Sequence, residues 1–89
     1  MDLLAIEKEI HGLIRQIRPD IDTGKLKSGD WLTSSEHGFT GLNLAYLFFE
    51  IESKFNITLD GEKLRNYEFV TVGGIVRAVQ KALAKEKAV

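Results

Sequence analysis

The sequence predicts an all-α fold, a small bundle of helices, and three observations lead to this prediction. Apolar residues recur at intervals of three and four over three separate segments, which is the spacing of one face of an α-helix. A proline and several glycines separate these segments. No segment alternates apolar and polar residues as a half-buried β-strand does. The expected order is a long helix, a long crossover connection, a second helix, a short third helix and a last helix.

The first helix is expected near the N-terminus. Pro19 ends it, because proline disfavours helical geometry in the preceding residue and has no N–H to donate. The connection over residues 20–40 contains three glycines, and a loop of this length usually carries function or hides a helical turn. The apolar stripe of the first helix is Leu3, Ile6, Ile10, Leu13, Ile14 and Ile17, and the anchors in the connection are Ile21, Leu26, Trp31, Leu32 and Phe39.

The second helix is expected to be capped by Thr40 and to end near Asn56. Asp60 is a candidate cap for the short third helix over residues 62–65. The inward stripe of the second helix is Leu44, Leu47, Phe48, Ile51 and Phe55.

The last helix is expected to begin after Thr71, which is its cap. Gly73 and Gly74 weaken the first turn by about 1 kcal/mol each relative to alanine, so we expect close packing there. The stripe of this helix is Val72, Ile75, Val76, Val79 and Leu83.

The composition of the chain excludes several classes of function. The 89 residues fit a single domain, residues 1–89, and 44% hydrophobic with 28% charged residues is the composition of an ordinary soluble protein. The absence of cysteine excludes disulfides, thiolate nucleophiles and thiolate metal sites. With a net charge of −1 the chain has no excess of positive charge with which to bind nucleic acid. No apolar run is long enough to cross a membrane. We therefore expect a cytoplasmic monomer that binds neither nucleic acid nor membranes.

The second helix carries a further apolar set, almost opposite its inward stripe. Such a helix is either covered by other elements or presents apolar surface to a partner. Burial beneath the long connection, where Trp31 and Phe39 need packing partners, is the alternative to a docking face. The set is Leu42, Ala45, Tyr46 and Phe49.

Two segments resemble acyl carrier proteins and the related peptidyl and D-alanyl carrier proteins. They are LNLAYLFFEIESKFNITL and NYEFVTVGGIVRAV, and with the order of elements they extend the resemblance over nearly the whole chain. The NYEF segment is also similar to carrier-related proteins of peptide maturation systems. The resemblance implies a four-helix bundle of the acyl carrier protein type, with a long loop between the first two helices and a short third helix. It also implies docking to biosynthetic enzymes through the second helix.

The resemblance further implies where a 4'-phosphopantetheine arm would be attached. Alignment of Phe55 and Ile57 with the end of the family's second helix places Gly41 at the position of the modified serine, and Thr40 replaces the preceding aspartate. Leu42 matches the leucine that follows the serine. Because glycine has no hydroxyl to take the phosphate, we expect no cofactor.

Three other hydroxyls are alternative attachment positions. Ser34, Ser35 and Thr40 precede Gly41, but attachment at Ser35 would require more than one and a half additional helical turns before Phe55. Loop polarity or helix capping explains these hydroxyls more simply.

Catalytic and metal sites are not expected. His11 and His37 do not have the spacing of a metal site, and Glu36 beside His37 adds only a sequence neighbour. A serine of the loop with His37 would still need an orienting carboxylate in a formed pocket.

The expected function is therefore a non-enzymatic module that docks to enzymes of lipid or peptide natural-product biosynthesis. The expected contacts are Leu42, Tyr46, Phe49 and Glu50. One alternative is a covalent acyl or peptidyl carrier loaded at Ser34, Ser35 or Thr40, and another is a small protein that holds a free acyl chain between its helices.

Overall fold

The computed structural model describes residues 2–61 and 69–87. Within these ranges the chain forms three α-helices, one 3₁₀-helix and no β-strand, which confirms the all-α prediction. The elements are α1 (Leu3–Ile17), η1 (Thr23–Lys25), α2 (Gly41–Phe55) and α4 (Val72–Lys87). The short third helix predicted over residues 62–65, with Asp60 as its cap, lies outside the described residues.

Helix α1 begins and ends close to where the sequence predicts. Asp2 caps it, since its carboxylate accepts a hydrogen bond from the Ala5 backbone N–H at 2.8 Å. The helix ends at Ile17, one residue before the C-cap Arg18 and two before Pro19. Leu3, assigned to the inward stripe, is 52% exposed because it lies in the first turn, beyond the edge of the core.

Helix α2 is capped at both ends by the residues that the sequence predicts, Thr40 and Asn56. Thr40 forms a capping box with Asn43, in which each side chain accepts a hydrogen bond from the other residue's backbone N–H. At the other end Asn56 adopts the left-handed conformation, with φ of 52°, and its N–H donates to the Glu52 carbonyl. The two caps fix where α2 begins and ends, and so fix which of its residues face the core.

The first turn of α4 packs tightly against the long connection. Thr71 caps the helix by accepting from the Gly74 N–H at 3.0 Å. The Gly73 N–H donates to the Ser28 carbonyl at 2.9 Å, and a Cβ at position 73 would lie 2.6 Å from the Ser28 hydroxyl oxygen. The prediction of close packing at Gly73 is therefore confirmed.

The long connection contains the short helical turn η1, and backbone hydrogen bonds hold its second half. The Leu32 N–H donates to the Val70 carbonyl at 2.7 Å, and the Phe39 N–H donates to the Leu32 carbonyl at 2.9 Å. An isolated antiparallel bridge joins Trp31 to Thr71. Of the five predicted anchors four are buried, whereas Trp31 is 50% exposed.

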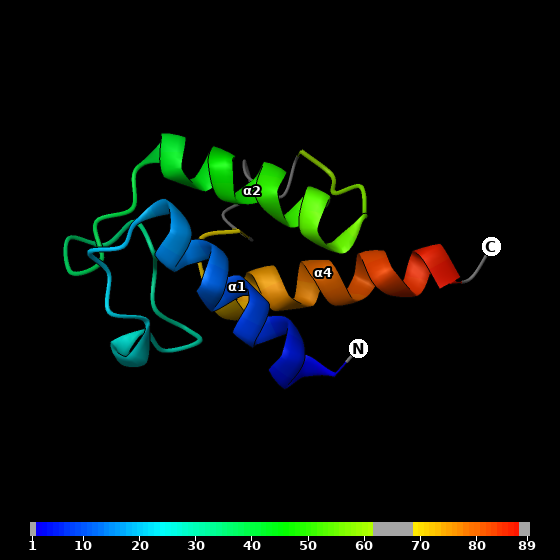
Figure 1. Cartoon of the computed structure of the whole chain (residues 1–89), viewed down its shortest axis with the longest axis horizontal. Coiled ribbons are helices and arrows are strands. Elements are labelled where there is room, and N and C mark those ends of the chain that lie inside the picture. The colour runs from blue at the N-terminus through cyan, green and yellow to red at the C-terminus, as the bar shows by residue number, and fades with distance from the viewer. Residues whose placement is uncertain (1, 62–68, 88–89) are drawn as a thin grey trace.

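The three α-helices enclose one core. Helix α1 crosses and contacts both α2 and α4 (Figure 1). The Phe48 ring of α2 lies against the Phe69 ring, with 5.3 Å between ring centroids. The radius of gyration of 12.2 Å equals the ~12 Å expected for a compact chain of this length. The long connection lies at the end of the molecule where α2 begins (Figure 1).

Candidate docking site

Helix α2 has two apolar faces, and only one of them belongs to the core. Leu44, Leu47, Phe48 and Ile51 are buried and Phe55 is partly buried, as the inward stripe predicts. These residues contribute to the cluster shared with α1 and α4. The opposite face therefore has no place in this core.

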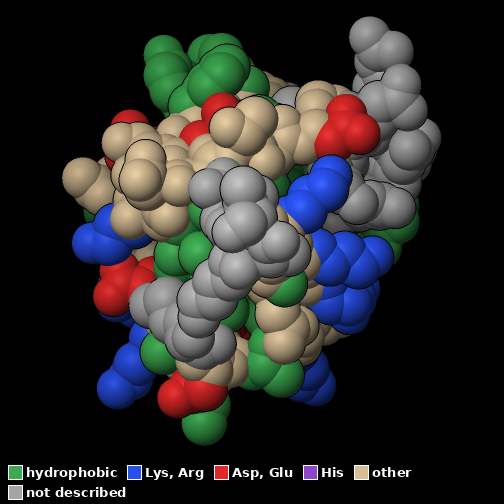
Figure 2. Space-filling model, turned by 90° about the vertical axis from the view of Figure 1, so that its right-hand side faces the viewer, with side chains coloured by type: hydrophobic (Ala, Val, Ile, Leu, Met, Phe, Trp, Pro, Cys, Tyr) green, Lys and Arg blue, Asp and Glu red, His purple; other side chains and the backbone are tan. Residues whose placement is uncertain are grey.

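The outward face of α2 is exposed. Leu42 is 66%, Tyr46 55% and Phe49 64% exposed, and only Ala45 beside them is half-buried. Hydrophobic side chains project from the top of the molecule, where α2 lies (Figure 2). Positions 42, 46 and 49 follow the spacing of one helix face, so the three side chains form one row. Phe39 of the long connection is buried in the core, and the connection does not cover this row.

One acidic side chain, Glu50, borders this row. Glu50 is exposed in the turn next to Tyr46. Lys54 is turned toward α1, where its ammonium lies 3.2 Å from the Glu9 carboxylate. Glu52 accepts a hydrogen bond from the Leu59 N–H at 2.8 Å. The charge that the outward face offers to a partner is therefore the negative charge of Glu50.

Gly41 is the first residue of α2 and is exposed. A Cβ at this position would meet no atom within 4 Å, and Gly41 is not among the residues with positive φ. The absence of a hydroxyl at the predicted attachment position is thus not imposed by lack of space or by the backbone conformation.

Arg18 joins the end of α1 to the start of α2. Its guanidinium donates to the Gly38 carbonyl at 2.8 Å and to the Asn43 side-chain oxygen at 3.0 Å. It also donates to both carboxylate oxygens of Asp20, at 2.9 and 2.7 Å. The hydrogen bond from Arg18 lowers the pKa of Asp20 below its ordinary value. Since Asn43 also belongs to the capping box, Arg18 supports the first turn of α2.

We expect Arg18→Ala to loosen this turn. The variant loses all four hydrogen bonds, so the amides of Thr40 and Asn43 should exchange faster with solvent, while the amides in the middle of α4 keep their protection. Arg18→Lys retains the charge but not the planar fork that reaches acceptors in three residues, and should behave like Arg18→Ala. Hydrogen exchange followed by NMR measures this, and unchanged rates at Thr40 and Asn43 would show that the capping box is independent of Arg18.

The alternative attachment hydroxyls differ in their surroundings. Thr40 Oγ1 accepts from the Asn43 N–H at 3.1 Å, as a helix cap. Ser34 is half-buried, and its hydroxyl oxygen lies 3.4 Å from the His37 backbone nitrogen. Ser35 is exposed. All three lie outside α2, whose first residue is Gly41.

The two histidines lie apart. His37 is buried, and its Nε2 is 3.2 Å from the Asp30 carboxylate. The pKa of Asp30 is lowered mainly by the hydrogen bond from the Lys27 backbone N–H and secondarily by His37. His11 is half-buried, with its Nε2 3.8 Å from Glu7 Oε1. Among residues 2–61 and 69–87, no group of three or more His, Cys, Asp or Glu side chains is placed to hold a metal ion.

Two side-chain interactions were not predicted from the sequence. One involves Arg18, whose partners Gly38 and Asn43 lie 20 and 25 residues away in the chain. The other pairs Asp30 with the buried His37. The only available signal was the position of Arg18 directly before Pro19, at the end of a helix, and this position does not reveal which groups the guanidinium contacts.

Comparison of the chain with models of protein families, with curated proteins and with solved structures found no match. Of the helices in the described part of the chain, none combines the length and apolarity needed to cross a membrane.

Proposed function

We propose that this chain is a non-enzymatic docking module of the carrier-protein type, without a phosphopantetheine arm, that binds cytoplasmic biosynthetic enzymes through the outward face of α2. The four-helix bundle of the acyl carrier protein type is part of this proposal. The described residues support it with three α-helices in the expected order and a long connection between the first two. Lipid or peptide natural-product assembly is proposed from the sequence resemblance.

The exposed row on α2 is the observation that carries the proposal. Leu42, Tyr46 and Phe49 are each more than half exposed, although the same helix buries a complete second stripe. Full burial of a side chain of this size yields about 1.5–3 kcal/mol, so a partner that covers the row gains a substantial part of its binding free energy. Aromatic residues are also enriched among the few that dominate binding at protein interfaces.

The charge of Glu50 indicates what the partner offers. A complementary surface has an apolar pocket for Tyr46 and Phe49, with a lysine or arginine at its edge to meet Glu50. In this arrangement the apolar row supplies most of the affinity and Glu50 sets the orientation.

The proposed absence of a phosphopantetheine group follows from Gly41. Phosphopantetheine is attached through a phosphoester to a side-chain oxygen, and Gly41 has none. The open space around position 41 provides a direct test, since a serine fits there.

The test uses Gly41→Ser with a broad-specificity phosphopantetheinyl transferase and coenzyme A, followed by intact mass. We expect the variant to gain one phosphopantetheine group at position 41. If the variant is folded and stays unmodified, the carrier-type surface is absent and the proposal is wrong.

The docking face is tested in the Gly41→Ser background. Adding Tyr46→Ser and Phe49→Ser should slow the transfer at least tenfold, while the thermal midpoint changes little because both side chains are exposed. Adding Leu4→Ser instead, at an exposed position on α1, should leave the rate unchanged. Equal rates for all three proteins would show that the row on α2 is not a docking face, and a large loss of stability would show that Tyr46 and Phe49 support the core.

A further inference from the structure

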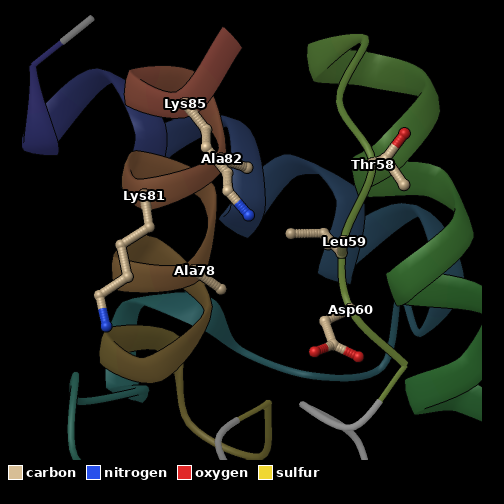
Figure 3. A pocket seen from close by; sticks show the side chains of 7 residues that line it. All are labelled: Thr58, Leu59, Asp60, Ala78, Lys81, Ala82 and Lys85. Carbon is tan, nitrogen blue, oxygen red and sulfur yellow. The ribbon is translucent and has the colours of Figure 1, made fainter. Parts of the chain in front are cut away.

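A hollow surface lies between the C-terminal half of α4 and the segment that follows α2. The cavity there measures about 390 Å³, a size that fits a small ligand or part of a peptide. Figure 3 shows the segment of residues 58–60 facing α4 across it. The lining residues are Thr58, Leu59, Asp60, Ala78, Lys81, Ala82 and Lys85.

We call this cavity the slot. Its floor is apolar and is held in place by a hydrogen bond. Leu59 and Ala78 are buried and Ala82 is half-buried. The Leu59 side chain points across the slot toward α4 (Figure 3). Its backbone N–H donates to the Glu52 carboxylate at 2.8 Å, which anchors the segment to α2. This hydrogen bond fixes the position of Leu59 relative to α2.

The α4 wall of the slot is positively charged, whereas the opposite wall carries the carboxylate of Asp60. Lys81 and Lys85 are exposed and lie one turn apart, and Arg77 continues the row one turn earlier. In Figure 3 the Lys85 ammonium reaches toward the slot, whereas Lys81 follows the outer edge of the helix. Helix α4 contains four basic residues and one acidic residue, although the whole chain has a net charge of −1. The positive charge is thus concentrated on this helix.

The spacing of Lys81 and Lys85 along α4 suits a peptide. The Cα atoms of Lys81 and Lys85 are separated along α4 by a rise of about 6 Å, from 1.5 Å per residue. In an extended chain, side chains two residues apart lie on one side with a separation of about 6.6–6.8 Å. Two carboxylates of such a chain therefore match the spacing of the two lysine Cα atoms, and the side chain between them points the other way, toward the opposite wall of the slot.

We propose that this slot binds an acidic, partly apolar peptide segment of a partner protein, with carboxylates on Lys81 and Lys85 and an apolar side chain over Leu59 and Ala82. A membrane surface fits less well, because Leu59 and Ala78 are buried below the ammonium groups and cannot insert between lipids. The slot is separate from the outward face of α2, so this proposal does not depend on the proposed function.

The test measures binding of a short fluorescein-labelled peptide that alternates Glu and Leu, by fluorescence anisotropy on the full chain. We expect saturable binding that weakens with added salt. The affinity should fall at least tenfold in Lys81→Gln/Lys85→Gln. The matched control Lys8→Gln/Lys25→Gln, on α1 and η1, should bind like the wild type. Ala82→Leu, which fills the slot without a change of charge, should also weaken binding.

Charge reversal separates recognition from nonspecific adhesion. Lys81→Glu/Lys85→Glu should lose the Glu/Leu peptide and bind the corresponding Lys/Leu peptide. The proposal is overturned if a Gln/Leu peptide binds the wild type equally well, or if the lysine variants bind the acidic peptide unchanged. It is also overturned if the chain binds vesicles of anionic phospholipid through Lys81 and Lys85 but not the peptide.

Discussion

Leu47→Ala is expected to lower the free energy of unfolding by about 2–5 kcal/mol, the range measured for large-to-small substitutions in cores. Leu47 is completely buried, and it lies on the face of α2 that packs into the shared core. Removal of its side chain leaves a cavity that the neighbouring residues fill only in part. A loss of this size is a large share of the 5–15 kcal/mol typical of folded domains, and urea unfolding monitored by circular dichroism measures it.

Leu42→Ala is the matched control, because it removes the same atoms from the other face of the same helix. Leu42 is 66% exposed, so the free energy of unfolding should change by less than about 0.5 kcal/mol. Similar losses in both variants would mean that the outward face of α2 is also packed in solution, and would remove the basis for docking there.

Gly73→Ala is expected to destabilise the chain, because the overpacking costs about 1–3 kcal/mol. The added Cβ would lie 2.6 Å from the Ser28 hydroxyl oxygen and 3.2 Å from its carbonyl oxygen. The Gly73 N–H already donates to that carbonyl at 2.9 Å, so the connection cannot move away without loss of a hydrogen bond. The better helix propensity of alanine offsets at most about 1 kcal/mol of this cost. Thermal unfolding of the variant measures the net effect.

A second substitution shows whether the contact with Ser28 is the cause. Ser28→Ala removes the hydroxyl, so Gly73→Ala should cost less in that background, although the contact with the carbonyl remains. A coupling energy of about 0.5–3 kcal/mol is typical of residues in contact. An absence of coupling would show that the Ser28 hydroxyl does not cause the cost of Gly73→Ala.

The helices could be predicted because their signals are local. The inward stripes, the caps Thr40 and Thr71 and the stop at Pro19 each depend on residues within one or two turns. These signals also placed Leu42, Tyr46 and Phe49 opposite the core side of α2. They did not decide between exposure and cover by the connection, because that depends on where a separate segment folds.

The contacts that shape the long connection could not be predicted. Arg18 reaches Asn43 across 25 residues and the Leu32 N–H meets the Val70 carbonyl, and neither pairing leaves a periodic signal in the sequence. Trp31 was expected to pack as an anchor, but it lies at the bridge to Thr71 with half of its surface exposed. The slot beside Lys85 was missed for the same reason, since its two walls are distant in the chain.

The most direct test of the account is the intact mass of the wild-type chain after treatment with a phosphopantetheinyl transferase and coenzyme A, with the Gly41→Ser variant in parallel. We expect an unchanged mass for the wild type and a gain of one phosphopantetheine group for the variant. A gain on the wild-type chain, mapped to Ser34, Ser35 or Thr40, would contradict it and identify a covalent carrier.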